Sequence, residues 1–561
     1  MLMSVLLAGA MVGCSGLHVA RGVPIIAKSP HGLLVSDAQG LPDLQRGNQA
    51  RLAGRLDEAE RDLAPLARRG YPDAQLYMAA IYGQKESREA QDEAISLYRK
   101  VLPRRPEAAV PLARMFMRRG DQSSVLEAQR LLLHAERDPG GPAAQAALLD
   151  LYAQCPELDV KGRAPALAQA AATSPLVELR NSAIDWYRAT LADHGHARRL
   201  LELCRRDLAA IPTCYVDLAT YYRYSEDHAA LEALVVQAIK SLQPVATVSN
   251  FDTLDYDPLE LPQVASRLAT AMVDQPLGED PAEVDEEMAL AQEAETEAQA
   301  EAEDESVDAV PAQGAAPQYA DLPQQAPAPT TAAAIPTNAQ PELANRILRW
   351  MLQQPGGMPV EAAGVAVSFP YLLADVDLEA VLKSGVAAGI ARASLFLGEL
   401  YYFNQRIPRE AQLGEASLRH SLDFRSTLAA GHYRLGRLYQ QGYLGRPDPQ
   451  KSLDNFLYAA RRRVTAADTH LARLFYDSPG ARINRINAYV FARLSEDGGV
   501  PVIVHVLRAG ILSEYRLLDH LRAELTPEEL QSAETLYRRE LAVHLVARPP
   551  VSPDVWVKEA S

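Results

Sequence analysis

The stretch GHYRLGRLYQQGYLGRPDPQKSLDNFLYAA, residues 431–460, decides the fold of this chain. Four of its residues, Gly431, Leu435, Gly436 and Tyr439, fall at offsets 0, 4, 5 and 8. On a helix these offsets lie along one stripe, in the order small, large, small, aromatic. The small residues let a neighbouring helix approach closely, and the aromatic ring fills the space one turn later. A glycine-containing turn and a second amphipathic run follow, so the stretch predicts a helical hairpin.

The same stripe recurs along the chain. Its aromatic positions are 34 to 36 residues apart in the first part of the chain, and 38 and 36 apart in the last part. A period near 35 with two helices per unit is typical of tetratricopeptide (TPR) repeats, in which each unit buries its apolar face by stacking on its neighbours. We therefore predict an all-α fold, a right-handed superhelical solenoid of about nine to ten TPR-like helical hairpins. The small and aromatic positions used for this prediction are Ala74, Tyr82, Phe116, Tyr152, Tyr187, Tyr222, Ala393, Gly398, Tyr401, Gly436, Tyr439 and Phe475.

Two regions fit the period less well. The unit at 41–70 is degenerate, although its second helix is recognisable. Between 341 and 390, DVDLEAVLKSGVAAG has a helical pattern that cannot be phased with the repeats. Further on, LTPEELQSAETLY at 525–537 has Thr, Pro and Glu where a capping box needs them. It predicts a terminal helix that caps the solenoid and starts after Thr526.

An acidic segment interrupts the repeats at 276–340. It holds fifteen Asp or Glu, eight Pro and no Lys or Arg, so the rest of a chain of net charge −16 is nearly neutral. This composition buries too little apolar surface to offset the entropy lost on ordering. We predict a disordered Pro/Ala-rich insert between repeats at 41–275 and repeats plus capping helix at 341–548, with a tail at 549–561. The alternative is an electrostatic lure for a basic partner. Either way, it is open whether the two halves form one continuous superhelix.

The N-terminus begins MLMSVLLAGAMVGCSG. Thirteen uncharged residues before the cysteine are too few to cross a bilayer, which takes about 20, but they fit a secretory signal segment at 1–13. The small residues directly before Cys14 resemble a bacterial lipobox. That resemblance implies a diacylated Cys14 and a lipidated tether at 14–40, and Ser15 in place of Asp favours sorting to the outer membrane. The alternative is an ordinary signal peptide with an unrelated cysteine.

The sequence shows no pattern of a catalytic, metal or cofactor site. Walker, G-x-S-x-G, H-E-x-x-H and G-x-G-x-x-G motifs are absent. Cys204 and Cys214 could meet across a helical hairpin, but we interpret them as two buried thiols. The negative net charge argues against nucleic acid as a partner. Paired arginines at 104–105, 118–119 and 205–206, and the run at 461–463, are interpreted as helix C-terminal charges. The alternative for each is contact with an anionic polymer.

The glycine-containing loop, the Asp after it and the closing Ala-Ala pair of YLGRPDPQKSLDNFLYAA resemble the Sel1-like subclass of these repeats. Together with the lipobox and the terminal LTPEEL helix, this chain resembles the AlgK family of alginate-export lipoproteins over about 45–275 and 341–550. The resemblance implies a non-enzymatic scaffold, lipid-anchored in the outer membrane and facing the periplasm. Its implied partners are the membrane through the N-terminal lipid, the outer-membrane β-barrel alginate porin, and periplasmic alginate-modifying proteins, without cofactors.

Two other functions are compatible with the repeats. One is a Sel1-like envelope adaptor that binds cell-wall or signalling proteins, because individual repeats of this kind are not specific to one pathway. The other is an enzyme, such as a lyase, with a site built across several repeats.

Overall fold

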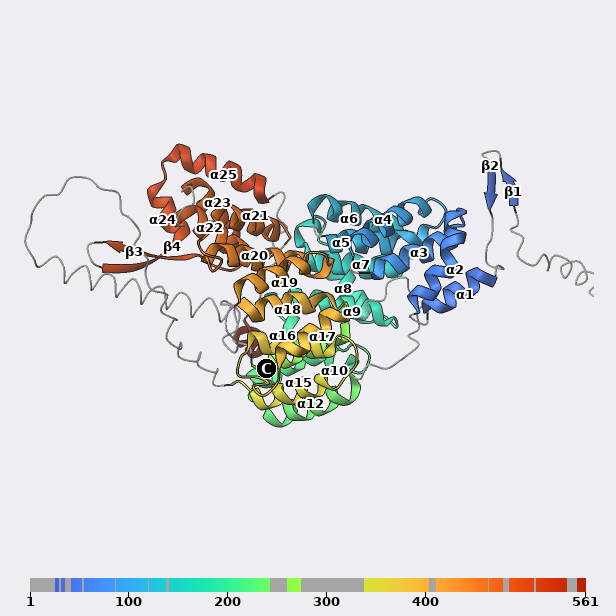
Figure 1. Cartoon of the computed structure of the whole chain (residues 1–561), viewed down its shortest axis with the longest axis horizontal. Helices are drawn as coiled ribbons and strands as arrows, with labels where there is room; N and C mark the ends of the chain where they lie inside the picture. Colours follow the sequence, from blue (N-terminus) through green and yellow to red (C-terminus); the bar gives the residue numbers. More distant parts are fainter. Residues whose placement is uncertain are drawn as a thin grey trace, which may run out of the picture. The chain divides into compact units, whose positions relative to one another are not determined.

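The structure is a computed structural model of the whole chain (Figure 1). The residues that it describes are 26–29, 32–35, 42–52, 55–85, 87–119, 121–137, 141–242, 260–273, 338–402, 410–462, 464–477, 484–508, 511–541 and 552–560. They belong to two compact units. The first includes the described residues up to Leu148 except residues 121 and 122. The second includes those two residues and the described residues from Leu149 onward.

The first unit begins with a short β-hairpin and continues as helices. The strands β1 and β2 pair antiparallel, with Ile26 opposite Val35. Successive helices α1 to α5 then pack against one another, around a core that includes Leu63, Tyr71 and Ile81. The elements are β1 (Ile26–Ser29), β2 (Gly32–Val35), α1 (Pro42–Leu52), α2 (Leu56–Arg68), α3 (Pro72–Gln84), α4 (Arg88–Val101), η1 (Pro106–Ala108), α5 (Ala109–Arg119), α6 (Gln122–Ala135) and α7 (Gly141–Gln154), which runs into the second unit.

The second unit is a longer series of helices that pack in chain order. Its first part holds η2 (Pro156–Leu158), α8 (Ala164–Ala172), α9 (Val177–Ala189), α10 (His196–Asp207), α11 (Cys214–Tyr224), α12 (His228–Ser241), α13 (Glu260–Ala271) and α15 (Pro341–Leu352). Its second part holds α16 (Met358–Ser368), α17 (Leu378–Ala387), α18 (Ala391–Tyr402), α19 (Ala411–Ser421), η3 (Arg425–Thr427), α20 (Leu428–Gln441), α21 (Pro449–Ala460), α22 (Ala466–Asp477), α23 (Arg485–Asp497), β3 (Ile503–Arg508), β4 (Ile511–Arg516), α24 (Leu517–Glu524), α25 (Pro527–Leu541) and α26 (Pro553–Ala560).

The prediction of an all-α fold built from consecutive helical hairpins is confirmed. The pairs α3–α4, α18–α19, α20–α21 and α22–α23 are hairpins (Figure 1). From α8 to α12 and from α13 to α23, each described helix of the second unit contacts the next one, and α12 contacts α15. Glycines make the close approach possible. A Cβ atom on Gly398 would lie 2.6 Å from the side chain of Leu418, and one on Gly436 would lie 2.6 Å from the ring of Phe456. Both are contacts between the two helices of one hairpin.

In three hairpins, an equivalent backbone hydrogen bond closes the turn between the stripe helix and the second helix. The carbonyl oxygens of Tyr401, Tyr439 and Phe475 accept from the N–H groups of Glu410, Asp448 and Asn484, at 3.0, 2.9 and 2.8 Å. These three donors are the N-cap residues of α19, α21 and α23. The aromatic position therefore fixes the start of the second helix through its main chain as well as filling space with its ring.

The acidic segment leaves from and returns to a single helical hairpin. Helix α13 lies before it, α15 lies after it, and the two helices pack together. The backbone N–H of Gln340 donates to the carbonyl oxygen of Met272 at 2.7 Å. The pair stacks on α11 and α12, and α16 contacts both of its helices. Within the second unit the stack thus continues past the insertion point, because the residues on either side form one repeat.

This pairing explains why 341–390 could not be phased from the sequence. Helix α15 is the second helix of a repeat whose first helix precedes the acidic segment, so the local period is broken. The next repeat is the α16–α17 pair, which contains the helix recognised in DVDLEAVLKSGVAAG. Thus the predicted domain boundaries at 275 and 341 remain predictions, and residues 338–340 of the predicted insert are part of this hairpin's closure.

One β-hairpin and one helix of the second unit were not predicted. The strands β3 and β4 pair antiparallel, with Ile503 opposite Arg516, between α23 and α24. Near the C-terminus, α26 contacts α10 and α11, and its Val557 is buried. The predicted capping box is confirmed. The backbone N–H of Thr526 donates to the Glu529 carboxylate at 2.9 Å, and the N–H of Glu529 donates to the Thr526 hydroxyl at 3.3 Å.

Candidate functional site

The structure places the stripe residues in the helix interfaces. Those that are buried are Ala74, Phe116, Tyr152, Tyr187, Ala393, Gly398, Tyr401, Gly436 and Tyr439. Those that are partly buried are Tyr82, Tyr222 and Phe475. They serve packing within and between hairpins. The charged residues that line a cavity are not stripe residues, and no sequence pattern indicated them.

Three of the stripe tyrosines each make the same kind of polar contact, a hydrogen bond to a glutamate. The hydroxyls of Tyr82, Tyr401 and Tyr439 donate to Glu60, Glu379 and Glu415, at 3.1, 2.8 and 2.6 Å. Each glutamate lies on the helix that precedes the tyrosine's own hairpin. Burial, followed by the glutamate bond, raises the pKa of all three tyrosines, so they stay neutral donors. The contact fixes how one repeat sits on the repeat before it.

Arg–carboxylate pairs link the first helices of successive repeats in the second unit. Arg188 on α9 contacts Asp217 on α11 at 2.8 Å. Arg392 on α18 contacts Glu361 on α16 at 2.8 Å, and Arg434 on α20 contacts Glu399 on α18 at 2.7 Å. The carboxylates are buried while the arginines reach partly into solvent. Although burial acts to lower the pKa of Arg188, Asp217 and Asp185 outweigh it and raise the pKa.

A cavity of about 600 Å³ opens among these first helices. Its walls come from α11, α13, α16, α18 and α20, with Pro553 of α26 at one side. The volume lies within the range of about 300–1,000 Å³ that is usual for small-molecule sites. Four arginines and one glutamate line it, together with aromatic rings and small hydroxyl side chains. The four arginines are Arg223, Arg267, Arg392 and Arg434.

The single acidic group in the cavity wall is Glu361. Burial raises the pKa of this carboxyl, and Arg392, Ser266 and Arg267 act in the opposite direction. Arg223 is 1% exposed, and it donates to the carbonyl oxygens of Ala271 at 2.8 Å and Asn338 at 3.2 Å. The cavity wall is therefore rigid on the side of α11 and carries more positive than negative charge.

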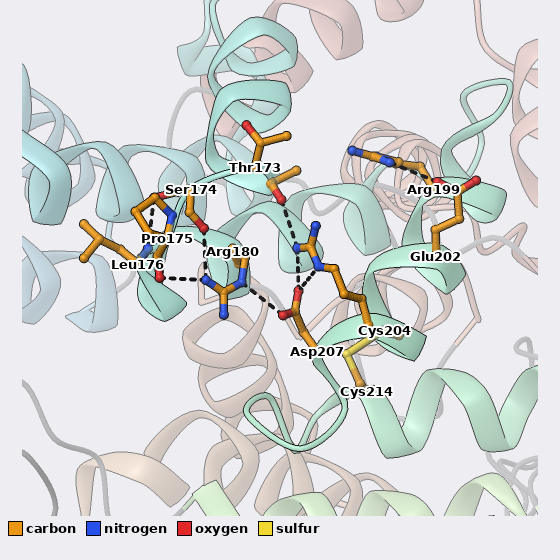
Figure 2. A network of polar contacts seen from close by, with 12 residues as sticks. Thr173, Ser174, Pro175, Leu176, Arg180, Arg199, Glu202, Cys204, Asp207 and Cys214 are labelled. Carbon is orange, nitrogen blue, oxygen red and sulfur yellow. Dashed lines mark hydrogen bonds and ion pairs between the residues drawn. A yellow bond between two sulfur atoms is a disulfide. The ribbon is translucent and has the colours of Figure 1, made fainter.

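A second polar cluster lies at the α9–α10 end of the same unit. Figure 2 shows Asp207 beside Arg180, with the disulfide bond between Cys204 and Cys214 close by. Arg180 donates to Asp207 at 3.1 Å and to the carbonyl oxygens of Ser174 and Pro175. Arg206 binds the other oxygen of Asp207 at 2.5 Å. These bonds connect α10 to the loop before α9. Both oxygens of the Asp207 carboxylate accept from arginine side chains, so this cluster stabilises the fold.

The interpretation of Cys204 and Cys214 as two thiols is wrong. The structure joins them in a disulfide across the α10–α11 hairpin, with Cα atoms 5.0 Å apart. Both cysteines are fully buried, and the hairpin turn brings them within bonding range. Asp217 lies close enough to form a metal-binding triad with them. Sulfur atoms that are bonded to each other are not thiolate ligands, so the cluster is structural.

Some predictions concern residues that the structure does not describe. The signal segment, Cys14 and most of the tether lie outside the described residues, as do residues 274–337 of the acidic segment. Within the described part of the chain, every helix is too short or too polar to span a bilayer.

Fold and site together define a helical-repeat protein of the TPR and Sel1-like class, with a positively charged cavity among its stacked helices. No protein-family model matches the chain. The resemblance to the AlgK family is confirmed: the chain is a homologue of the alginate biosynthesis protein AlgK. It is 27% identical to AlgK of Pseudomonas syringae pv. tomato over 525 residues, 93% of each chain. It is 27% identical to AlgK of Pseudomonas aeruginosa over 532 residues, 92% of each chain.

The chain is also similar to a third AlgK protein over a shorter stretch, and distantly similar to a solved structure. The chain is 36% identical to AlgK of Azotobacter vinelandii over 148 residues, which are 26% of this chain and 29% of that one. Among solved structures, a protective antigen of uropathogenic Escherichia coli with an SLR fold is 16% identical. The match covers 89% of this chain and 96% of that chain, with a TM-score of 0.29.

The arginine pairs and the cavity were missed because their residues have no common register. Arg188 comes directly after the stripe aromatic Tyr187, whereas Arg434 lies inside its stripe, between Gly431 and Leu435. Arg392 comes one residue before the stripe that begins at Ala393. A period near 35 therefore does not reveal them, although stacking brings Arg392 and Arg434 to one cavity.

Proposed function

We propose that the chain is a non-enzymatic, outer-membrane lipoprotein scaffold of an alginate secretion complex. In this function it binds and positions the export porin and periplasmic polymer-modifying proteins through its repeats. The observation that carries the proposal is the similarity to AlgK proteins over more than nine tenths of the chain. A relative that matched only one or two repeats would support the fold and nothing more.

The structure supports this role physically. Stacked repeats present a long, rigid surface, because each repeat is fixed on the last by buried contacts. The Tyr–Glu bonds and the Arg–carboxylate pairs hold that spacing from one repeat to the next. A scaffold that holds a barrel and several enzymes together raises their effective concentration at the point of export. Lipidation of Cys14 would keep this surface at the inner leaflet of the outer membrane.

A pull-down tests the proposal. The membrane-anchored chain is purified from its native envelope in a mild detergent, and co-purifying proteins are identified by mass spectrometry. We expect an outer-membrane β-barrel together with alginate-modifying proteins, both reduced in a Cys14→Ala strain. Recovery of cell-wall enzymes or a signalling protein in their place would favour the Sel1-like envelope adaptor. Depolymerisation of alginate by the purified chain would contradict the non-enzymatic assignment.

A further inference from the structure

The cavity among the first helices of the second unit has a surplus of positive charge. Two of its four arginines are neutralised by carboxylates, Arg392 by Glu361 and Arg434 by Glu399. Arg223 donates to the main-chain carbonyl oxygens of Ala271 and Asn338. The cavity wall thus holds four arginines and one glutamate. Such a cleft favours an anionic ligand, because field lines are concentrated between its low-dielectric walls.

Arg267 is the cavity arginine that is ready to bind a ligand. It lies on α13, it is exposed, and it has no hydrogen-bond or ion-pair partner among the residues that the structure describes. A guanidinium group presents donors in a planar fork that matches the two oxygens of a carboxylate. Arg392, on α18, lines the same cavity and keeps 34% of its side chain exposed although it contacts Glu361, the carboxylate on which Arg267 also acts electrostatically. A carboxylate placed in the cavity therefore meets two guanidinium groups from different repeats.

The rest of the wall suits a sugar ring. Phe369 provides aromatic surface, whereas Phe396 is buried beneath Arg392, with 4.8 Å between guanidinium carbon and ring centroid. The hydroxyls of Thr220 and Ser368 donate to the carbonyl oxygens of Val216 and Gly364, at 3.0 and 3.4 Å. Their oxygen lone pairs are then left to accept from a ligand. A polyhydroxylated ligand supplies such donors, whereas an acidic peptide supplies few.

We propose that this cavity binds a hexuronate unit of an anionic polysaccharide, with Arg267 and Arg392 on the carboxylate and the Phe369 ring against the pyranose. The inference rests on the proposed function, since it makes the scaffold a direct contact for the polymer that the complex exports. Each wall of the cavity comes from a different repeat, so the site requires the stack of α11, α13, α16 and α18.

Titration calorimetry on the purified full chain tests the site. The probes are an oligomannuronate, a neutral mannose oligomer of the same length, and a polyglutamate peptide of equal charge. We expect the oligomannuronate to bind and the mannose oligomer not to bind. Arg267→Gln should weaken binding about tenfold, the effect of one charge-assisted hydrogen bond. Because Arg267 is exposed and unpaired among the described residues, this variant should fold normally.

Two further variants sharpen the test. Arg538→Gln removes an exposed arginine of α25 that does not line the cavity, and it should bind as the wild type does. Glu361→Gln removes the one negative charge in the wall at nearly constant shape, and it should tighten binding. Equal binding of the neutral oligomer, tighter binding of polyglutamate, or full affinity in Arg267→Gln would each overturn the proposal. If the pull-down recovers the porin while no oligouronate binds, this inference fails and the scaffold function stands.

Discussion

The backbone N–H of Gln340 donates to the carbonyl oxygen of Met272 at 2.7 Å, and this bond closes the base of the acidic segment. Arg223 reinforces the closure by donating to Ala271 on one side and to Asn338 on the other, across 115 residues of sequence. The two sides of the insertion are therefore parts of one repeat. Where the segment is cut should matter more than how much of it is removed.

Two deletions that differ by three residues test this. Removal of 276–337 keeps Asn338 and Gln340, so we expect an unchanged helical circular-dichroism spectrum and an unchanged urea midpoint. Removal of 276–340 takes away two acceptors of a guanidinium group that is 1% exposed. Loss of partners for a buried charged group should cost about 1.5–3 kcal/mol. Equal urea midpoints for the two deletions would contradict the closure.

The small positions of the stripe are set by a neighbouring helix. A Cβ atom on Gly436 would lie 2.6 Å from the ring of Phe456, which is fully buried. Gly436→Ala should therefore destabilise the chain by about 1–3 kcal/mol through overpacking. Gly83→Ala is the matched control, since its Cβ would meet only the sulfur of Met115 at 3.7 Å. By helix propensity that control should be neutral or up to about 1 kcal/mol more stable. Urea unfolding measures both, and equal destabilisation would argue against the packing explanation.

The disulfide between Cys204 and Cys214 closes a short loop, with a sequence separation of 10. By loop entropy it should stabilise the second unit by about 2–3 kcal/mol. Double replacement by alanine should lower the melting temperature, and addition of reductant should lower it in the wild type but not in the variant. Alkylation of the denatured, unreduced protein, followed by mass spectrometry, should leave both cysteines unlabelled. Labelling of both would show that the bond is absent.

Lipidation of Cys14 has a direct test. Radiolabelled palmitate should enter the wild-type chain in its native host and should not enter Cys14→Ala. The physical reason is that the lipid is attached through the Cys14 sulfur, and alanine has no sulfur to carry it. Fractionation should place the wild type in the outer membrane and the variant in the periplasm. Label in both proteins would show that the lipobox interpretation is wrong.

The predictable part of this fold is the part that is local in sequence. Gly436, Tyr439 and Asp448 lie within one hairpin, so their spacing alone indicated helix, turn and helix. The bonds that shape the cavity are long-range, as between Arg223 and Asn338 or between Arg434 and Glu399. Such pairs leave no local pattern, because the two residues meet only after the repeats have stacked. The cysteine pair lay within reach of sequence reasoning, since only a short turn separates its two helices.

Asp448 offers a prediction with a defined pH dependence. Its carboxylate accepts from the backbone N–H of Lys451 at 3.1 Å as the N-cap of α21, and that bond is the main reason why its pKa lies below the usual value. A carboxyl whose folded-state pKa is depressed stabilises the fold above its unfolded pKa, near 4. That contribution is lost as the pH falls through the folded-state value.

Asp448→Ala should therefore cost about 1 kcal/mol at pH 7, as the loss of an N-cap usually does. The difference from the wild type should shrink as the pH falls below about 4, where the unfolded wild-type chain takes up a proton, and onward through the lower folded-state pKa. Asp448→Asn is the control, because its amide oxygen still caps the helix but does not titrate in this range. Its stability relative to Asp448→Ala should be independent of pH. Urea midpoints from pH 3 to 7 measure all three proteins. An Asn variant as unstable as the Ala variant at pH 7 would show that Asp448 does not act as a cap.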